Sequence, residues 1–360
     1  MPKEHVIYLT KEGGVTKIVV LYNHKGGVSK TTTSFNLAHS IAERLNTKVL
    51  LVDGDPQCNL TELSLAKTIE HLDQAAAETG ELQQLPGTTI LDALGPRFRG
   101  ERPDVDVDSI DLIELLDTRV SLLRGDIGLS EAEDVLSQAH NLRTGTDVHQ
   151  KRNYVALHDM LKRLAEARGF SHVIVDVGPS AGALTRAFFL AADIFLAPVV
   201  PDRFNYQAIT SLSAIISKWI RENSAIVSDF QKLGLNVPLG SPQFRGLIMQ
   251  RYQRYAGEAK PAFKHWMQLI PKRVVERLLP SMIDASGSKD VVLESCWTAP
   301  VAVEIPDFAS LAPMMLTHGK PVWNLTEKET GWGGVVWVGR QEEMSNFKAK
   351  FYHLVDVVEA

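Results

Sequence analysis

The sequence predicts an α/β fold, with a mostly parallel, twisted sheet that carries helices on both faces. Continuous apolar runs are typical of parallel strands, because both faces of such a strand are buried. These runs occupy residues 18–22, 48–52, 172–177, 194–199, 246–250 and 301–305. Segments with apolar residues at helical spacing separate most of the runs. In a sheet of this kind, ligands bind at the carboxyl ends of the strands.

The stretch between the first run and the first helix, residues 23–32, reads N-H-K-G-G-V-S-K-T-T and predicts a phosphate-binding loop. Backbone N–H groups of such a turn and of the helix N-terminus converge on one anionic pocket. Lys30 would reach the β- and γ-phosphates there, and Thr31 would place its hydroxyl on Mg²⁺. The nucleotide-binding residues expected from this loop are Gly26, Gly27, Val28, Ser29, Lys30, Thr31 and Thr32. A glycine-rich turn with two solvated lysines is the alternative.

Carboxylates follow two of the predicted strands. Asp53 and Asp55 come directly after the second run, and Asp176 lies near the end of the third. The carboxyl ends of parallel strands share one edge of the sheet, so we expect these side chains beside the phosphate loop. A carboxylate in that place can hold Mg²⁺ through water. For the first pair, a turn capped by Asp and Asn is the alternative.

Taken together, these motifs resemble the ParA/MinD family of deviant Walker-A ATPases, which are P-loop NTPases. The string K-G-G-x-x-K-T-T carries a second lysine, Lys25, ahead of the glycines. The strings V-D-G-D-P-Q-C-N and D-V-G-P-S are similar to the family's V-D-x-D-P-Q-G-N and D-x-P-P-S. The sequence departs from the family at Ser29 and Cys58, where the family has glycine, and at Gly178, where it has proline.

The resemblance implies that ATP and Mg²⁺ are the cofactors. It gives catalytic roles to Lys30 and to two further residues: Lys25 would cross a dimer interface to the partner's γ-phosphate, and Asp55 would position the attacking water. The expected magnesium residues are Thr31, Asp53 and Asp176. In relatives, the segment after the last strand often shapes the adenine pocket. The residues that we expect at the base are Gln250, Pro306, Asp307 and Phe308.

The net charge of −5 hides an asymmetry along the chain. Residues 62–148 hold eighteen acidic and seven basic side chains, whereas residues 245–277 hold eight basic and two acidic ones. In the second stretch, basic and aromatic residues interleave, which favours a DNA-binding surface. A solvated helix face with aromatic residues in the core is the alternative. The candidate DNA-binding residues are Arg251, Arg254, Lys260, Lys264, Lys272 and Arg273.

We expect one ATPase domain over residues 1–360. Two insertions interrupt it, an acidic and partly helical one at 62–150 and a basic helical one at 251–300. A short hairpin is expected over residues 5–16. A C-terminal helix at 341–360 places apolar residues on one face, and its acidic end favours packing on the core over a membrane anchor.

The composition narrows the classes of protein further. No apolar run approaches the roughly eighteen residues that a membrane span needs, and the first residues do not predict a signal peptide. The two cysteines predict neither a disulfide framework nor a metal cage. We therefore expect a cytoplasmic protein, associated with the nucleoid if it binds DNA.

The leading functional hypothesis, implied by the resemblance, is an ATP hydrolase of plasmid or chromosome partition. ATP would bring two subunits face to face as a homodimer, and the dimer would bind DNA without sequence preference. A ParB-like or other activating protein would then stimulate slow hydrolysis and release. The alternative is a nucleotide-switched scaffold of the same fold, which recruits a protein partner in positioning or defence and does not move DNA.

Overall fold

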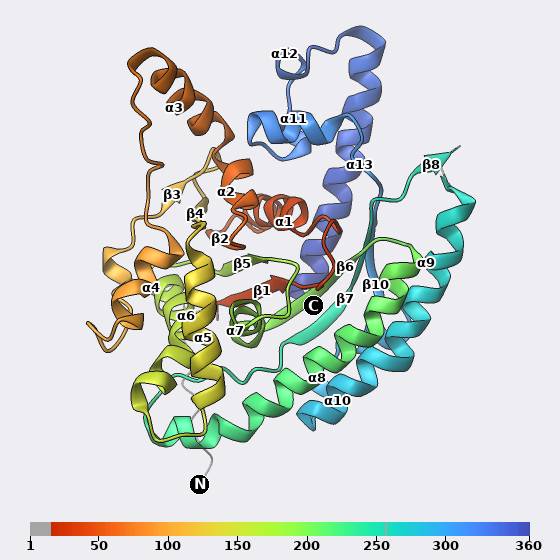
Figure 1. Ribbon diagram of the computed structural model, residues 1–360. Coiled ribbons are helices and arrows are strands. Elements are labelled where there is room, and N and C mark those ends of the chain that lie inside the picture. The colour runs from red at the N-terminus through yellow and green to blue at the C-terminus, as the bar shows by residue number, and fades with distance from the viewer. Residues whose placement is uncertain (1–15, 256–257) are drawn as a thin grey trace.

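The computed structural model describes residues 16–255 and 258–360, and its centre is an eight-stranded sheet (Figure 1). The strand order is β10-β7-β6-β1-β5-β2-β4-β3, and every neighbouring pair is parallel except β3 and β4. The strands are β1 (Lys17–Leu21), β2 (Val49–Gly54), β3 (Ile113–Glu114), β4 (Val120–Leu123), β5 (His172–Val177), β6 (Ile194–Val199), β7 (Gln243–Gln250) and β10 (Val301–Ile305). Nearly all of the hairpin expected over residues 5–16 lies outside the described residues.

Helices cover both faces of the sheet, so the predicted α/β fold is confirmed (Figure 1). On one face lie α1 (Lys30–Leu45), α2 (Asn59–Ser64), α11 (Leu311–His318) and α13 (Gly334–Glu359). On the other lie α4 (Ile90–Phe98), α5 (Leu129–Leu142), α6 (Val148–Arg168), α7 (Ala183–Ala191), α8 (Arg203–Lys232), α9 (Pro261–Arg273) and α10 (Leu279–Ser286). A short antiparallel pair, β8 (Arg254–Tyr255) and β9 (Glu258–Ala259), precedes α9.

Strand β1 shows why the apolar runs are continuous. Ile18 and Val20 belong to the hydrophobic cluster on one face of the sheet, and Val19 and Leu21 belong to the cluster on the other. All four side chains are fully buried. Burial of such a side chain contributes about 1.5–3 kcal/mol, so each face holds its own helical layer in place. The central position of β1 also fixes where the loop after it emerges.

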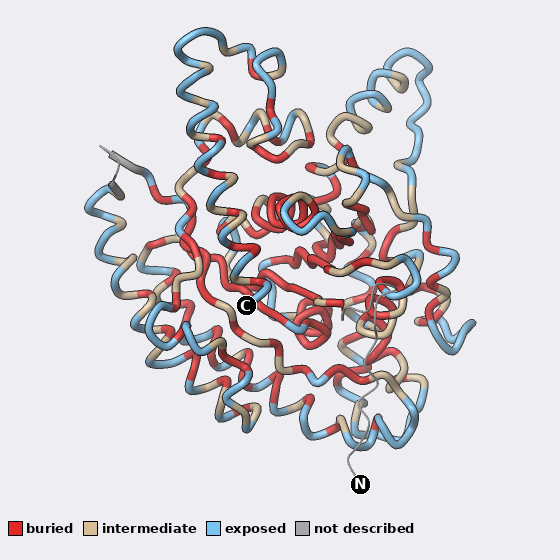
Figure 2. Tube along the Cα trace, turned by 180° about the vertical axis from the view of Figure 1, so that it is seen from behind, coloured by how far each residue is buried: buried red, intermediate tan, exposed pale blue. Residues whose placement is uncertain are grey.

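The acidic stretch 62–150 has two kinds of structure. Part of it belongs to the central fold: β4 pairs with β2 in the main sheet, and α5 covers one face. By contrast, α3 (Ala66–Thr79) has no buried residue and projects from the body of the molecule. Figure 2 shows this projection, and the one formed by α12 (Glu327–Thr330) and the start of α13, as largely exposed chain.

The C-terminal helix α13 packs on the core, as its amphipathic pattern predicts. Its buried apolar face includes Phe347 and Phe351, whose rings lie 4.4 Å and 6.4 Å from that of Phe308. At its end, Glu359 accepts a hydrogen bond from His172 at 2.7 Å and pairs with Lys17 at 3.1 Å. These two contacts lower the pKa of Glu359 to about 2 and join the helix to the amino ends of β1 and β5.

We expect Phe351→Ala to destabilise the protein by about 3–5 kcal/mol, because it removes a fully buried ring from the packed side of α13. Urea unfolding followed by circular dichroism measures the change. Val335→Ala is the matched control on the same helix, since Val335 is 90% exposed and should change stability by no more than about 0.5 kcal/mol. Equal effects of the two substitutions would contradict core packing by this helix.

Candidate nucleotide site

The loop between β1 and α1 lies at the carboxyl edge of the sheet, where the sequence predicts the phosphate site. Ser29 stands at the N-cap of α1 and makes no side-chain capping hydrogen bond. The first turn of the helix carries no acidic residue. Backbone N–H groups at this end therefore keep the partial positive charge that attracts a phosphate.

The side chain of Lys30 is buried within the phosphate loop. Its Nζ donates to the carbonyl oxygens of Asn23 at 3.1 Å and Lys25 at 3.2 Å. Burial lowers its pKa, while the charges of Asp176 and Asp55 act in the opposite direction. A phosphate is a stronger hydrogen-bond acceptor than a carbonyl oxygen. A phosphate in the loop would therefore compete with the two carbonyl oxygens for the Lys30 ammonium.

Two carboxylates face each other across neighbouring strands. Asp53 of β2 lies opposite Asp176 of β5 in the parallel register, and both side chains are buried. Asp53 accepts hydrogen bonds from the Thr61 backbone N–H at 2.8 Å and from its hydroxyl at 2.6 Å. Burial nevertheless raises the pKa of Asp53 to about 6. Thr61 of α2 thus fixes the Asp53 carboxylate by hydrogen bonds and makes none to Asp176.

Asp176 has the features of a magnesium residue. Its Oδ2 atom is buried without a hydrogen-bond partner, while Ser34 donates to Oδ1 at 3.3 Å. Burial and the nearby Asp53 raise its pKa, and a hydrogen bond from Thr31 acts against that rise. A divalent cation would supply the missing partner and offset the repulsion. Thr31 and Asp176 therefore fit Mg²⁺, with water and phosphate oxygens as the remaining ligands.

Asp55 lies at the same edge and is also buried. Its Oδ1 accepts the Gln57 N–H at 3.0 Å, as in an aspartate turn. A Cβ atom built on Gly178 would lie 3.0 Å from this Oδ1. The segment after Asp176 therefore approaches the Asp55 carboxylate closely, and glycine permits the approach where the family has proline.

The other two departures from the family pattern share one backbone feature. Ser29 and Cys58 both adopt left-handed conformations, with φ of 58° and 54°. Glycine reaches this region without strain, whereas side chains with a Cβ rarely do. The sequence therefore places strained residues at two turns beside the site, at positions where the family has glycine. Burial raises the pKa of the Cys58 thiol to about 12, which keeps it neutral.

Lys25 differs from Lys30. Its backbone N–H donates to Asn23 at 3.0 Å, but its ammonium makes no hydrogen bond or ion pair within residues 16–255 and 258–360. The side chain is partly exposed at the edge of the loop. It is therefore available to a group from outside the chain.

The residues expected at the base lie near one another, but they have different surroundings. Pro306 and Asp307 line a cavity of about 670 Å³, together with Tyr252 and one side of α13. Gln250 is buried, and its Oε1 accepts a hydrogen bond from Thr33 at 2.9 Å. Phe308 does not line this cavity and packs instead on the rings of α13. Pro306 and Asp307 are thus the members of the set that face open space.

The candidate DNA-binding residues do not form one group. Lys264 and Lys272 are exposed on α9, and Arg273 donates to Thr210 of α8 at 2.9 Å. Lys260 precedes α9 and donates to Gln253, while the side chain of Arg254 is not described. Arg251 is directed to the phosphate loop, because its guanidinium donates to the Gly27 carbonyl oxygen at 2.6 Å. A left-handed backbone at φ 56° accompanies this orientation toward the phosphate loop.

Several site residues escaped the sequence reasoning. Thr61 holds Asp53, Ser34 holds Asp176, and Ser211 of α8 lies 2.9 Å from the His24 ring. Thr61 and Ser34 lie on helices, where single hydroxyls carry no motif of their own. Their one signal is position, since both occur within a few residues of a recognised motif.

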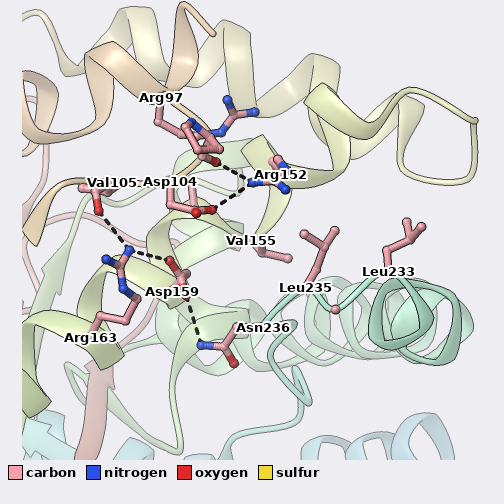
Figure 3. A pocket seen from close by; sticks show the side chains of 13 residues that line it. Arg97, Asp104, Val105, Arg152, Val155, Asp159, Arg163, Leu233, Leu235 and Asn236 are labelled. Atoms are coloured by element: carbon pink, nitrogen blue, oxygen red, sulfur yellow. Dashed lines mark hydrogen bonds and ion pairs between the residues drawn. The ribbon is translucent and has the colours of Figure 1, made fainter. Parts of the chain in front are cut away.

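A second cavity, of about 270 Å³, lies among α6, the segment after α4 and the segment after α8 (Figure 3). Arg152 pairs with Asp104 at 3.1 Å, and Arg163 pairs with Asp159 at 3.2 Å. None of its lining residues belongs to the predicted site. We read it as a structural cavity with paired charges.

The fold and the loop define a nucleotide-binding protein of the P-loop class. The family model of the AAA domain matches residues 16–228, more than half of the chain, so the chain belongs to this family. The resemblance to the ParA/MinD family is confirmed as distant homology to partition ATPases.

The relatives differ in how much they share with the chain. Chromosome partitioning protein ParA of Caulobacter vibrioides is 29% identical over 203 residues, or 56% of this chain and 62% of that protein. The match therefore spans less than two thirds of that relative. ParA of Myxococcus xanthus is 27% identical over 272 residues, which cover 76% of this chain and 78% of that protein.

Solved structures agree on the fold. A Corynebacterium diphtheriae protein has a TM-score of 0.63 at 22% identity and covers 84% of this chain and 97% of its own. The ATP complex of a McdA variant from Cyanothece has a TM-score of 0.58 at 18% identity and covers 96% and 98%. Within the described residues, no helix is long and apolar enough to cross a membrane.

We expect Ser29→Gly to stabilise the protein by about 0.4–1 kcal/mol, because glycine adopts φ 58° without strain. Urea unfolding measures the effect. Ser228→Gly makes the same chemical change in an exposed turn of α8 and should destabilise, because glycine is a poor helix former. Loss of stability in both variants would contradict the strain at Ser29.

Proposed function

We propose that the protein is a ParA-type ATPase that dimerises on ATP, binds DNA without sequence preference and hydrolyses ATP slowly. The observation that carries this proposal is the pair of lysines in one loop. Lys30 is buried and satisfied by the loop itself, while Lys25 is partly exposed and has no partner among the described residues. One loop thus offers one ammonium to its own nucleotide and another to a facing subunit.

The cofactors are ATP and Mg²⁺. Lys30 would hold the β- and γ-phosphates, and Thr31 and Asp176 would hold the cation. Bound Mg²⁺ would supply charge neutralisation at the phosphates. Asp53, held by Thr61, acts on this site through its position opposite Asp176. The base would enter beside Pro306 and Asp307, which line the larger cavity.

Hydrolysis needs a residue that orients water, and Asp55 is our candidate. Its Oδ1 already accepts the Gln57 N–H, so one face of the carboxylate is fixed. The close approach of Gly178 limits the space on another side. A carboxylate held in this way can accept a hydrogen bond from water while its orientation stays fixed. Turnover would be slow until a second subunit and an activating protein complete the site.

Helix α8 supports a connection between nucleotide and DNA. Near its start, Asn205 accepts a hydrogen bond from Asn23 of the loop at 3.3 Å, and Ser211 lies beside His24. Between those contacts, Thr210 accepts from Arg273 of the basic helix α9. The loop and the basic helix thus contact the same two turns of one helix.

A scaffold that recruits a protein partner is the second candidate function. The observation in its favour is α3, which projects from the acidic stretch without a single buried residue. Such a helix offers a surface to a partner without any change in the sheet. DNA binding decides between the two candidates, because the scaffold does not require it.

We expect Lys25→Ala to leave nucleotide binding to the monomer intact and to abolish the ATP-dependent dimer. Its ammonium contacts no polar partner in the described part of its own subunit, and a cation supplied in trans is worth on the order of 10³-fold in phosphoryl transfer. Light scattering and a phosphate-release assay measure the two effects. Lys30→Ala is the control and should lose nucleotide binding itself. Normal ATP-driven dimers of Lys25→Ala would overturn the proposal.

We expect the triple variant Lys264→Ala, Lys272→Ala and Arg273→Ala to weaken binding to any DNA duplex alike. It should also flatten the dependence on salt, because fewer phosphates are neutralised. Fluorescence anisotropy with random duplex and ATP measures both. The control removes three cations from the acidic stretch, Lys67, Arg99 and Arg102, and should bind as the parent does. A parent protein that ignores DNA at low salt would favour the scaffold.

A further inference from the structure

Arg251 is an exposed arginine with an unusual backbone. It follows β7 directly and adopts φ 56°, a conformation that is costly for a side chain with a Cβ. Strained residues of this kind persist where the surrounding structure holds them, and they concentrate at ligand sites. The residues on either side of Arg251 are both held by hydrogen bonds, and these fix its backbone conformation. Gln250 is fixed to Thr33 of α1, and the Tyr252 carbonyl accepts the Asp307 N–H at 3.2 Å.

The side chain crosses to the phosphate loop. Its Nη1 donates to the Gly27 carbonyl oxygen at 2.6 Å, a contact between residues 224 positions apart. Gly27 itself has φ 71°, and a Cβ built on it would lie 3.5 Å from that Nη1. The guanidinium makes no other hydrogen bond or ion pair with the described residues. Most of its five donors are therefore open at the edge of the loop.

The position of Arg251 lies between two parts of the nucleotide site. On one side is Gly27, in the loop that would hold the phosphates, and on the other is Tyr252, in the lining of the 670 Å³ cavity. A nucleotide with phosphates in the loop and its base in that cavity would pass the guanidinium where sugar and phosphate meet. A planar guanidinium suits phosphate oxygens, because it donates two parallel hydrogen bonds.

We propose that Arg251 is a nucleotide-binding residue, which tethers the phosphate loop through Gly27 and donates to the phosphate nearest the ribose. This inference rests on the proposed binding of ATP at the loop. It removes Arg251 from the DNA surface and gives it the same role toward nucleoside diphosphates and triphosphates. The left-handed backbone is what directs the side chain to the loop and away from α9.

The experiment uses Arg251→Gly in the full chain, because glycine relieves the positive φ while it removes the guanidinium. We expect a melting temperature equal to or above that of the parent. We also expect ADP and ATP to bind at least about tenfold more weakly, as for a lost charge-assisted hydrogen bond. Isothermal titration calorimetry with each nucleotide measures the dissociation constants. Arg251→Lys keeps the backbone and the charge and should be intermediate.

The control is Lys232→Ala, which removes an exposed cation from the far end of α8 and should leave both dissociation constants unchanged. At nucleotide concentrations that saturate Arg251→Gly, random duplex should bind it as tightly as it binds the parent. Unchanged nucleotide affinity in both Arg251 variants would overturn the inference, and a loss of duplex binding alone would return Arg251 to the DNA surface. A parent that binds neither ADP nor ATP would instead overturn the proposed function.

Discussion

The arrangement of charges at the carboxyl edge of the sheet depends on one unfavourable interaction, the burial of Asp53 opposite Asp176. Two carboxylates in neighbouring strands repel each other, and burial raises the pKa of both. Thr61 stabilises the first through two hydrogen bonds, whereas Oδ2 of the second has no partner. Such an arrangement is costly by itself and favourable once a cation binds. Ligand binding and folding stability should therefore be linked at this edge.

Much of the site follows from sequence because its parts are local. The phosphate loop is one continuous string between a buried strand and a helix, and Asp53 and Asp176 end two strands that had to share an edge. The apolar face of the C-terminal helix was likewise predicted from the spacing of its apolar residues. In each case, a single helix or strand determines where the residue lies. The neighbouring residues in the sequence are therefore enough to predict its position.

The remaining features depend on contacts between distant elements. Arg251 was grouped with the basic stretch because its charge matches, yet a left-handed backbone turns it to a loop 224 residues away. Phe308 was expected at the base because relatives often form the adenine pocket in this segment, and the structure packs its ring against Phe347 of α13. Neither outcome has a sequence signal, since positive φ in a residue other than glycine leaves no pattern. The helical spacing of α13 did not show which strand end it would cover.

Left-handed residues also explain how this chain tolerates its departures from the family. Ser29 and Cys58 adopt left-handed conformations that glycine reaches without strain, so these two turns form at an energetic cost. Gly178 has the opposite effect, because it removes a side chain from the approach to Asp55. The strained residues therefore stand at the N-caps of α1 and α2, whereas the glycine lies beside the Asp55 carboxylate.

Helix α8 contacts both the phosphate loop and the basic helix α9. It is 30 residues long and buries an apolar face, so its first turns cannot move without the helix that packs on them. Asn205 and Ser211 contact the phosphate loop, and Thr210 holds Arg273 of α9. A ligand that repositions the loop must therefore either break these hydrogen bonds or move the basic helix with it. These hydrogen bonds are therefore the contacts through which the phosphate loop and α9 would be coupled in the proposed function.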